Sequence, residues 1–249
     1  MNVYTNTEAE LAKIYAERFR QFVDRNIQGY NPINVLLPGS NIPEAVFTYL
    51  SRYYASKINW HCIHFFWTDE GFNTYDQEYS GYQIINQQLF QNIPIPYYNI
   101  HPIVVENHPF LEADRYTTVI NKHFQIFRDI PSFDWVMLSL GEDGELGSMF
   151  PEDIDMFYSN RLYEVVTNPK TKQTHISVTG KVLNWAKHIT IFATGKEKAD
   201  IVKTIFNRQN KYAKKPFPAE LINPYEGSLE WYVDYEAATH IKDDLDHNS

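Results

Sequence analysis

The stretch LSLGEDGELGSMFP, residues 138–151, places glycines and carboxylates directly after an apolar run. We expect 134–140 to be a buried strand. In an open parallel sheet, ligands bind beyond the carboxyl ends of the strands, where loops and helix N-termini converge. A loop at 141–147 would lie at that edge. The same residues also suit an ordinary tight turn with solvated carboxylates, and local chemistry alone leaves both interpretations open.

The rest of the chain alternates between helical and strand-like patterns. Thr7 and Glu10 form a capping-box pattern before an apolar stripe, which predicts a helix over 8–25. The run INVLL predicts a buried strand at 33–37, followed by a helix that Asn41 caps and that carries Pro43 in its first turn. Other expected strands are 62–67 and 189–194, other expected helices are 112–127 and 196–206, and the proline-rich pieces 92–103 and 214–224 are expected to be loops.

This alternation predicts an α/β fold: a mainly parallel sheet with helices on both faces, Rossmann-like, in one domain over 1–249. A length of 249 residues and an apolar content of 43% are ample for a sizeable core. The net charge of −9 argues against a nucleic-acid surface. The sequence has one cysteine, Cys62, no signal-like N-terminus and no stretch long enough to span a bilayer, so we expect a cytoplasmic protein with no membrane partner.

The opening stretch resembles the 6-phosphogluconolactonase motif L-G-x-G-x-D-G-H-x-x-S-L-F-P, of the superfamily that also holds glucosamine-6-phosphate deaminase. The residues in register are Leu138, Gly141, Asp143, Gly144, Ser148, Phe150 and Pro151. Further family segments follow in the family's order at 36–43, 58–70, 112–120, 168–200, 217–224 and 229–241. The resemblance covers nearly the whole chain and implies the fold of that superfamily.

Three family positions with functional side chains differ in this chain. Glu145 stands where the motif has its acid/base histidine, Gly71 where an arginine usually follows the D-E pair, and His175 where an arginine precedes I-T. A carboxylate can act as a general base, but its ordinary pKa near about 4.3 makes it a poor one at neutral pH unless burial raises that value. The scaffold pattern is not disturbed by these changes.

The resemblance implies a phosphate site and a catalytic site. Backbone N–H groups of Gly39, Ser40 and Asn41 at a helix entrance suit a phosphate, although a capped strand-to-helix turn explains them equally well. Lys198 matches the family's G-x-x-K-A lysine near the substrate phosphate, and Lys170 is a weaker candidate of the same kind. His175 can replace the missing arginine only if it is protonated or suitably oriented, and a packed histidine is the simpler alternative.

The expected catalytic groups are Glu145 as general base, Asp143 beside it, and Asp69 to orient water or sugar hydroxyls. Backbone N–H groups of Gly141 and Gly144 are expected to hold the oxyanion. Asp69 and Glu70 match the family's D-E pair. Without a cationic neighbour at Gly71 a raised pKa is favoured there, although capping and solvation explain the pair equally well.

No cofactor is expected. The four histidines His61, His64, His101 and His108 lack metal-ligand spacing, so the sequence predicts no metal.

Three functions remain open at the level of sequence. The leading hypothesis is hydrolysis of a phosphorylated sugar lactone, 6-phosphogluconolactone to 6-phosphogluconate, in the pentose phosphate pathway. The GEDG run at 141–144 is also close to the deaminase branch, which leaves an amino-sugar-phosphate isomerase or deaminase as the second. The third is a sugar-phosphate-binding protein that has lost catalysis. The expected partner in each case is a small sugar phosphate, and a homodimer is compatible with the sequence.

Overall fold

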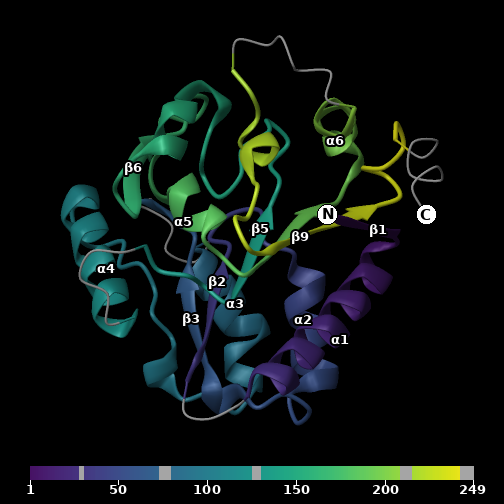
Figure 1. The fold of residues 1–249 in the computed structure, drawn as a ribbon, viewed down its shortest axis with the longest axis vertical. Helices are drawn as coiled ribbons and strands as arrows, with labels where there is room; N and C mark the ends of the chain where they lie inside the picture. Colours follow the sequence, from purple (N-terminus) through teal and green to yellow (C-terminus); the bar gives the residue numbers. More distant parts are fainter. Residues whose placement is uncertain (28–30, 73–79, 125–129, 208–214, 242–249) are drawn as a thin grey trace.

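A computed structural model describes residues 1–27, 31–72, 80–124, 130–207 and 215–241 (Figure 1). Its centre is a six-stranded sheet in the order β1-β9-β8-β5-β2-β3. All neighbouring strands in it pair in parallel. The strands are β1 Asn2–Asn6, β2 Ile33–Leu37, β3 Ile63–Trp67, β5 Trp135–Ser139, β8 His188–Ala193 and β9 Ser228–Asp234. Every residue of β2, β5 and β8 is buried, as expected for a parallel sheet covered on both faces.

Helices lie on both sides of this sheet, which confirms the predicted α/β class. α1, α2 and α3 lie on one side of β2 and β3, and α4 lies on the other (Figure 1). The helices are α1 Glu8–Asn26, α2 Glu44–Tyr54, α3 Gly81–Gln88, α4 Pro109–Phe124, α5 Gly180–Asn184 and α6 Ala199–Phe206. No helix within the described ranges is both long and apolar enough to cross a bilayer.

Most predicted elements are present, with shifted ends. α1 begins after Thr7, whose hydroxyl accepts the N–H of Glu10 at 3.3 Å. α4 starts at Pro109, three residues before its predicted start, and residues 125–127 of that prediction lie outside the described residues. The predicted helix 196–206 is divided into a 3₁₀ turn, Lys196–Lys198, and α6. The two proline-rich pieces are not purely loops, because they contain 3₁₀ turns at Tyr97–Asn99 and Pro218–Leu221.

The predicted start of the second helix was wrong. α2 begins at Glu44, with Pro43 at the capping position and no side-chain cap. Proline disfavours helical backbone at the residue before it, so Ile42 cannot belong to the helix. Asn41 adopts the left-handed conformation, with φ of 48°, and belongs to the loop.

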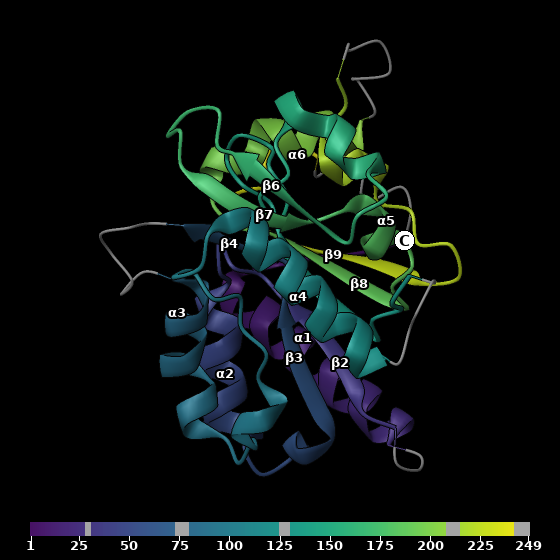
Figure 2. The same cartoon turned by 90° about the vertical axis from the view of Figure 1, so that its left-hand side faces the viewer.

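A second, three-stranded antiparallel sheet was not predicted. It has the order β4-β7-β6, with β4 Asp69–Phe72, β6 Tyr163–Thr167 and β7 Thr174–Val178. Only Thr68 separates β3 from β4, so the chain leaves the parallel sheet and enters the small one at once. Figure 2 shows this sheet above the ends of β2 and β3. The arrangement places β7 beside the loops that follow the parallel strands.

Candidate active site

The candidate site lies where four parallel strands end. The segments that follow these strands are 38–43 after β2, Thr68 with β4 after β3, 140–150 after β5 and 194–198 after β8. Because β8, β5, β2 and β3 are successive neighbours in a parallel sheet, their carboxyl ends share one edge. The predicted site residues of these loops therefore come from adjacent strands.

Asp69 joins three of these loops through its carboxylate. Oδ1 accepts the Gly39 N–H at 3.0 Å and the Thr68 hydroxyl at 2.6 Å, while Oδ2 accepts the hydroxyls of Ser40 and Ser148, each at 2.7 Å. The Asp69 side chain is fully buried. With both oxygens already occupied, Asp69 positions the loops. The expectation that it orients water or sugar hydroxyls stays a prediction.

The Gly39 backbone is also occupied. A Cβ atom on Gly39 would lie 1.8 Å from the Asp69 carbonyl oxygen, so only glycine fits beside this residue. Because the Gly39 N–H donates to Asp69, it is not available to a phosphate, and α2 begins too far along the chain for Asn41 to offer a helix N-terminus. The predicted phosphate cradle at 39–41 therefore lacks the Gly39 N–H in this conformation, and a contact from the Ser40 and Asn41 N–H groups stays a prediction.

Ser148 connects Asp69 to His175. Ser148 has a left-handed backbone, with φ of 57°, and its Oγ lies 3.1 Å from His175 Nδ1. Since the Ser148 proton goes to Asp69, Nδ1 of His175 must be the donor, and Nε2 is left as an acceptor. Ser148 was not among the predicted site residues, although it stands in register with the motif, which was the available signal.

His175 does not replace the missing arginine as a cation. Burial lowers its pKa, and the negative charge of Asp69 only partly opposes this. The imidazole is therefore neutral at neutral pH. Its Nε2 is buried and has no hydrogen-bond partner among the described residues. β7 places His175 opposite Gly71 of β4, at the point where two of the family's arginines are absent.

Glu145 lies at the same edge and contacts the loop after β2. Its Oε1 accepts a hydrogen bond from Asn41 Nδ2 at 2.7 Å. The side chain is half-buried, and this burial raises the pKa of Glu145 to about 7, with the negative charges of Asp69 and Asp143 adding to the effect. At neutral pH about half of this carboxyl group is ionised. Both non-glycine residues of left-handed backbone in these loops, Asn41 and Ser148, support groups of the site.

The 141–145 turn is closed by its own hydrogen bonds. The Gly141 N–H donates to the Glu145 carbonyl at 2.9 Å, and the Gly144 N–H donates to the Gly141 carbonyl at 3.1 Å. Both N–H groups are therefore already used in this conformation, and their oxyanion role stays a prediction. Asp143 Oδ1 accepts the Glu145 N–H at 3.2 Å, and its Oδ2 lies 3.4 Å from Lys170 Nζ. Lys170 thus balances the acidic charge beside Glu145.

Lys198 lies in the loop after β8, beside the loop that follows β5. Burial lowers the pKa of Lys198, against the attraction of Glu197, Asp234, Glu8 and Glu142. The residue is only 9% exposed, and no carboxylate of the described chain lies within ion-pair distance of its Nζ. A buried ammonium without an anionic contact suits an anionic ligand. Lys198 belongs to this site through its positive charge and its place after a neighbouring strand. Among the described residues it makes no direct contact with the other site residues.

Glu70 has a different role from Asp69. Its carboxyl group accepts the N–H groups of Gly71, Gly81 and Tyr82 at 3.2, 3.2 and 3.3 Å, and so caps the start of α3. Burial raises the pKa of Glu70 to about 8, and the Asp69 charge contributes less. The capping interpretation holds for this residue. The raised pKa favoured for the pair is found at Glu70, with burial as its main cause.

The fold and this edge define a Rossmann-like α/β protein whose polar groups lie beyond the carboxyl ends of parallel strands. A sequence model described as glucosamine-6-phosphate isomerases/6-phosphogluconolactonase matches residues 6–231. The chain belongs to this family.

Individual relatives agree with this assignment. The 6-phosphogluconolactonase of Haemophilus influenzae is 35% identical over 210 residues, which are 83% of this chain and 87% of the relative. The crystal structure of a devB protein is 32% identical, has a TM-score of 0.85, and covers 96% of this chain and 99% of that one. A monomeric glucosamine-6-phosphate deaminase superposes with a TM-score of 0.77 at 19% identity, covering 96% of this chain and 100% of that one. The last likeness shows the fold alone.

Proposed function

We propose that this protein hydrolyses a phosphorylated sugar δ-lactone, 6-phosphogluconolactone, to 6-phosphogluconate, with Glu145 as the general base. The observation that carries the proposal is the state of Glu145. It stands at the position of the family's histidine, and burial raises its pKa to about 7. A base works best when its pKa lies near the working pH, so this carboxylate matches an imidazole at neutral pH.

The reaction needs one group that accepts and returns a proton, and one hydrogen-bond donor to the oxyanion. Glu145 takes a proton from water as the water oxygen bonds to the lactone carbonyl carbon. The tetrahedral intermediate then breaks its bond to the ring oxygen, and protonated Glu145 returns the proton to that oxygen. Asn41 uses one amide hydrogen to hold Glu145, and we assign its second hydrogen to the oxyanion.

Lys198 is the group that we assign to the substrate phosphate. It is buried, carries no ion pair with the described carboxylates and lies at the same strand edge. Lys170, paired with Asp143, contributes positive charge nearby. No cofactor takes part in this scheme. We place the reaction in the cytoplasm, within the pentose phosphate pathway, and the single Cys62 agrees with a reducing compartment. A homodimer stays a prediction.

The test compares wild type with Glu145→Gln in lactone hydrolysis, after subtraction of the spontaneous rate at each pH. We expect kcat/KM of the wild type to rise about tenfold per pH unit below pH 7 and to level off above it, because the ionised form of Glu145 is the base. Glu145→Gln should lose at least about 100-fold in kcat/KM, and its kcat/KM should not rise with pH in this way.

Two results would count against the proposal. Equal activity of wild type and Glu145→Gln would remove Glu145 from the mechanism. Saturable thermal stabilisation by 6-phosphogluconate without turnover would favour the binding protein that lacks catalysis. Ammonia release from glucosamine 6-phosphate, measured in parallel, distinguishes the deaminase.

A further inference from the structure

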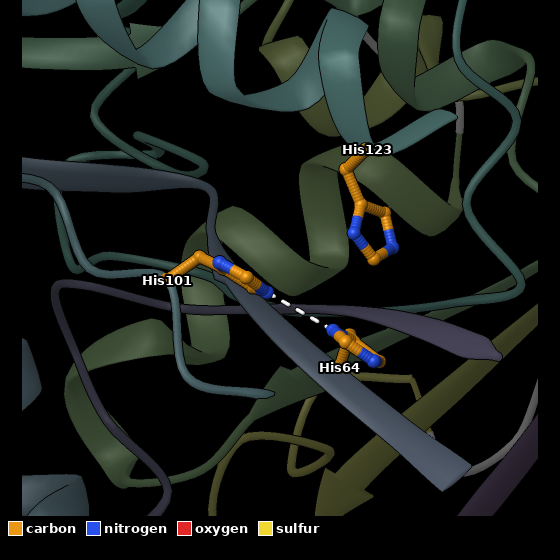
Figure 3. Close-up of side chains that lie close together, drawn as sticks. All are labelled: His64, His101 and His123. Atoms are coloured by element: carbon orange, nitrogen blue, oxygen red, sulfur yellow. Dashed lines mark hydrogen bonds between the residues drawn. The ribbon is translucent and has the colours of Figure 1, made fainter. Parts of the chain in front are cut away.

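Three histidines from separate parts of the chain meet on the face of the sheet that α4 covers (Figure 3). His64 is the second residue of β3, His101 follows the 3₁₀ turn Tyr97–Asn99, and His123 is in the last turn of α4. One ring nitrogen of each lies within 4.8 Å of the others. The sequence predicted no metal, because His64 and His101 lack metal-ligand spacing, and it gave no signal at His123. The tertiary structure brings the three together.

The distances approach those of a metal centre. His64 Nδ1 and His101 Nε2 are 3.0 Å apart. With zinc–nitrogen bonds of about 2.0–2.1 Å and tetrahedral angles, two ligand nitrogens are separated by about 3.3 Å. The first pair therefore already has nearly the required separation. The His123 nitrogen, within 4.8 Å of the other two, must move inward to complete the site.

The third imidazole has an outer partner of the kind that metal-bound histidines use. His123 Nε2 lies 2.6 Å from Asn34 Oδ1. An amide oxygen accepts a proton, so this contact keeps the proton on Nε2 and leaves Nδ1 with a free electron pair. Asn34 is itself fixed, because it pairs with His64 across β2 and β3. Figure 3 shows the His123 ring directed from α4 toward His64.

Neighbouring groups hold the histidine rings in place. Phe66 stacks on His101 with ring centroids 4.5 Å apart and contacts His123 edge-on at 5.1 Å. The His101 backbone donates to the Phe65 carbonyl and accepts from the Tyr116 hydroxyl. The position of the cluster is therefore set by the packing of β3 against α4.

We propose that His64, His101 and His123 bind one divalent transition-metal ion of the zinc type, with a water molecule as fourth ligand. Imidazole nitrogens are typical ligands of such ions. His64 and Trp67, at the other end of β3, are three residue steps or about 10 Å apart, so this centre is apart from Asp69 and Glu145. Its role is structural: it joins β3, the segment after Asn99 and the end of α4. Lactone hydrolysis does not depend on it.

Zinc titration of the full-length, tag-free protein after chelator treatment tests the site. Isothermal titration with ZnCl₂ should give one ion per chain, and zinc should raise Tm in a saturable way. Replacement with Co²⁺ should give the visible absorption bands of a four-coordinate site. His64→Gln, His101→Gln and His123→Gln should each weaken zinc binding by more than about tenfold.

Matched variants separate this centre from other histidines. His61→Gln and His108→Gln change exposed histidines and should bind zinc like wild type, as should His175→Gln at the sugar-phosphate site. Circular dichroism checks each fold. If His101→Gln does not fold, His123→Gln and Asn34→Ala provide the test. Asn34→Ala should weaken zinc binding by about tenfold. Absence of stoichiometric binding, or binding that persists in folded His123→Gln, would overturn the proposal.

Discussion

Single residues of this site differ from the family pattern, and their neighbours compensate. A carboxyl group at 145 would be a weak base in water, but half-burial and two nearby acids bring its pKa to about 7. The sequence shows that an acid stands at this position, but it does not reveal the pKa shift, because the shift depends on which residues cover the side chain. His175 shows the opposite case. Its charge was left open in the sequence, and burial makes it neutral.

Lys198→Ala tests the phosphate contact at the residue scale. Loss of a charge-assisted hydrogen bond should raise KM for the phosphorylated lactone by about 10- to 100-fold and change kcat little. Lys196→Ala is the matched control, since Lys196 lies in the same 3₁₀ turn and is exposed. Steady-state kinetics of the two variants measure the difference. Equal KM values would remove Lys198 from the phosphate site.

At the scale of elements, the site is a junction of loops that follow adjacent strands. The loops after β2, β3 and β5 all donate to the Asp69 carboxylate. The strands were predictable from their apolar runs, and the position of the glycine-bearing loop followed from them. The antiparallel sheet that supplies His175 was not predicted. Its strands β6 and β7 are close in sequence, but β4 pairs with β7 across about 100 residues, and no local pattern indicates that pairing.

Asp69→Asn tests the junction. The amide NH₂ replaces an acceptor with a donor and leaves buried donors without partners, so the free energy of unfolding should fall by about 2 kcal/mol or more, and lactone hydrolysis should be lost. Ser40→Ala removes only one donor and should cost about 1 kcal/mol. Urea denaturation and activity assays measure both. An Asp69→Asn protein as stable and active as wild type would show that the loops are held by other contacts.

On the scale of the whole molecule, the first helix and the first and last strands are joined inside the fold. β1 pairs with β9, and Arg18 of α1 forms a bidentate salt bridge with Glu230 of β9. Glu230 is 1% exposed. Burial opposes its ionisation, but hydrogen bonds from His188 and Arg18 hold the pKa of Glu230 at about 2. The first helix and the last strand therefore belong to the same folding unit.

Arg18→Met should lower the free energy of unfolding at pH 7 by about 2 kcal/mol, because it leaves a buried carboxylate with fewer donors. Arg20→Met, on the same helix, removes ion pairs with the more exposed Glu17 and Asp24 and should lower the free energy of unfolding much less than Arg18→Met, because solvent screens these pairs. Chemical denaturation at pH 7 compares the two. Similar losses in both variants would mean that the Glu230 contact does not hold the ends together.

The sequence by itself determined the α/β class, the strands β2, β3, β5 and β8 of the parallel sheet, most of its helices and the family, because periodic apolar runs and local motifs are properties of neighbouring residues. The edge strands β1 and β9 were not predicted. Only the tertiary structure decided which groups meet and in which charge state. Asp69 with Ser148, Asn41 with Glu145, and the three histidines on β3, after Asn99 and on α4 are contacts between distant residues. Their pKa values follow from burial, which no short stretch of sequence specifies.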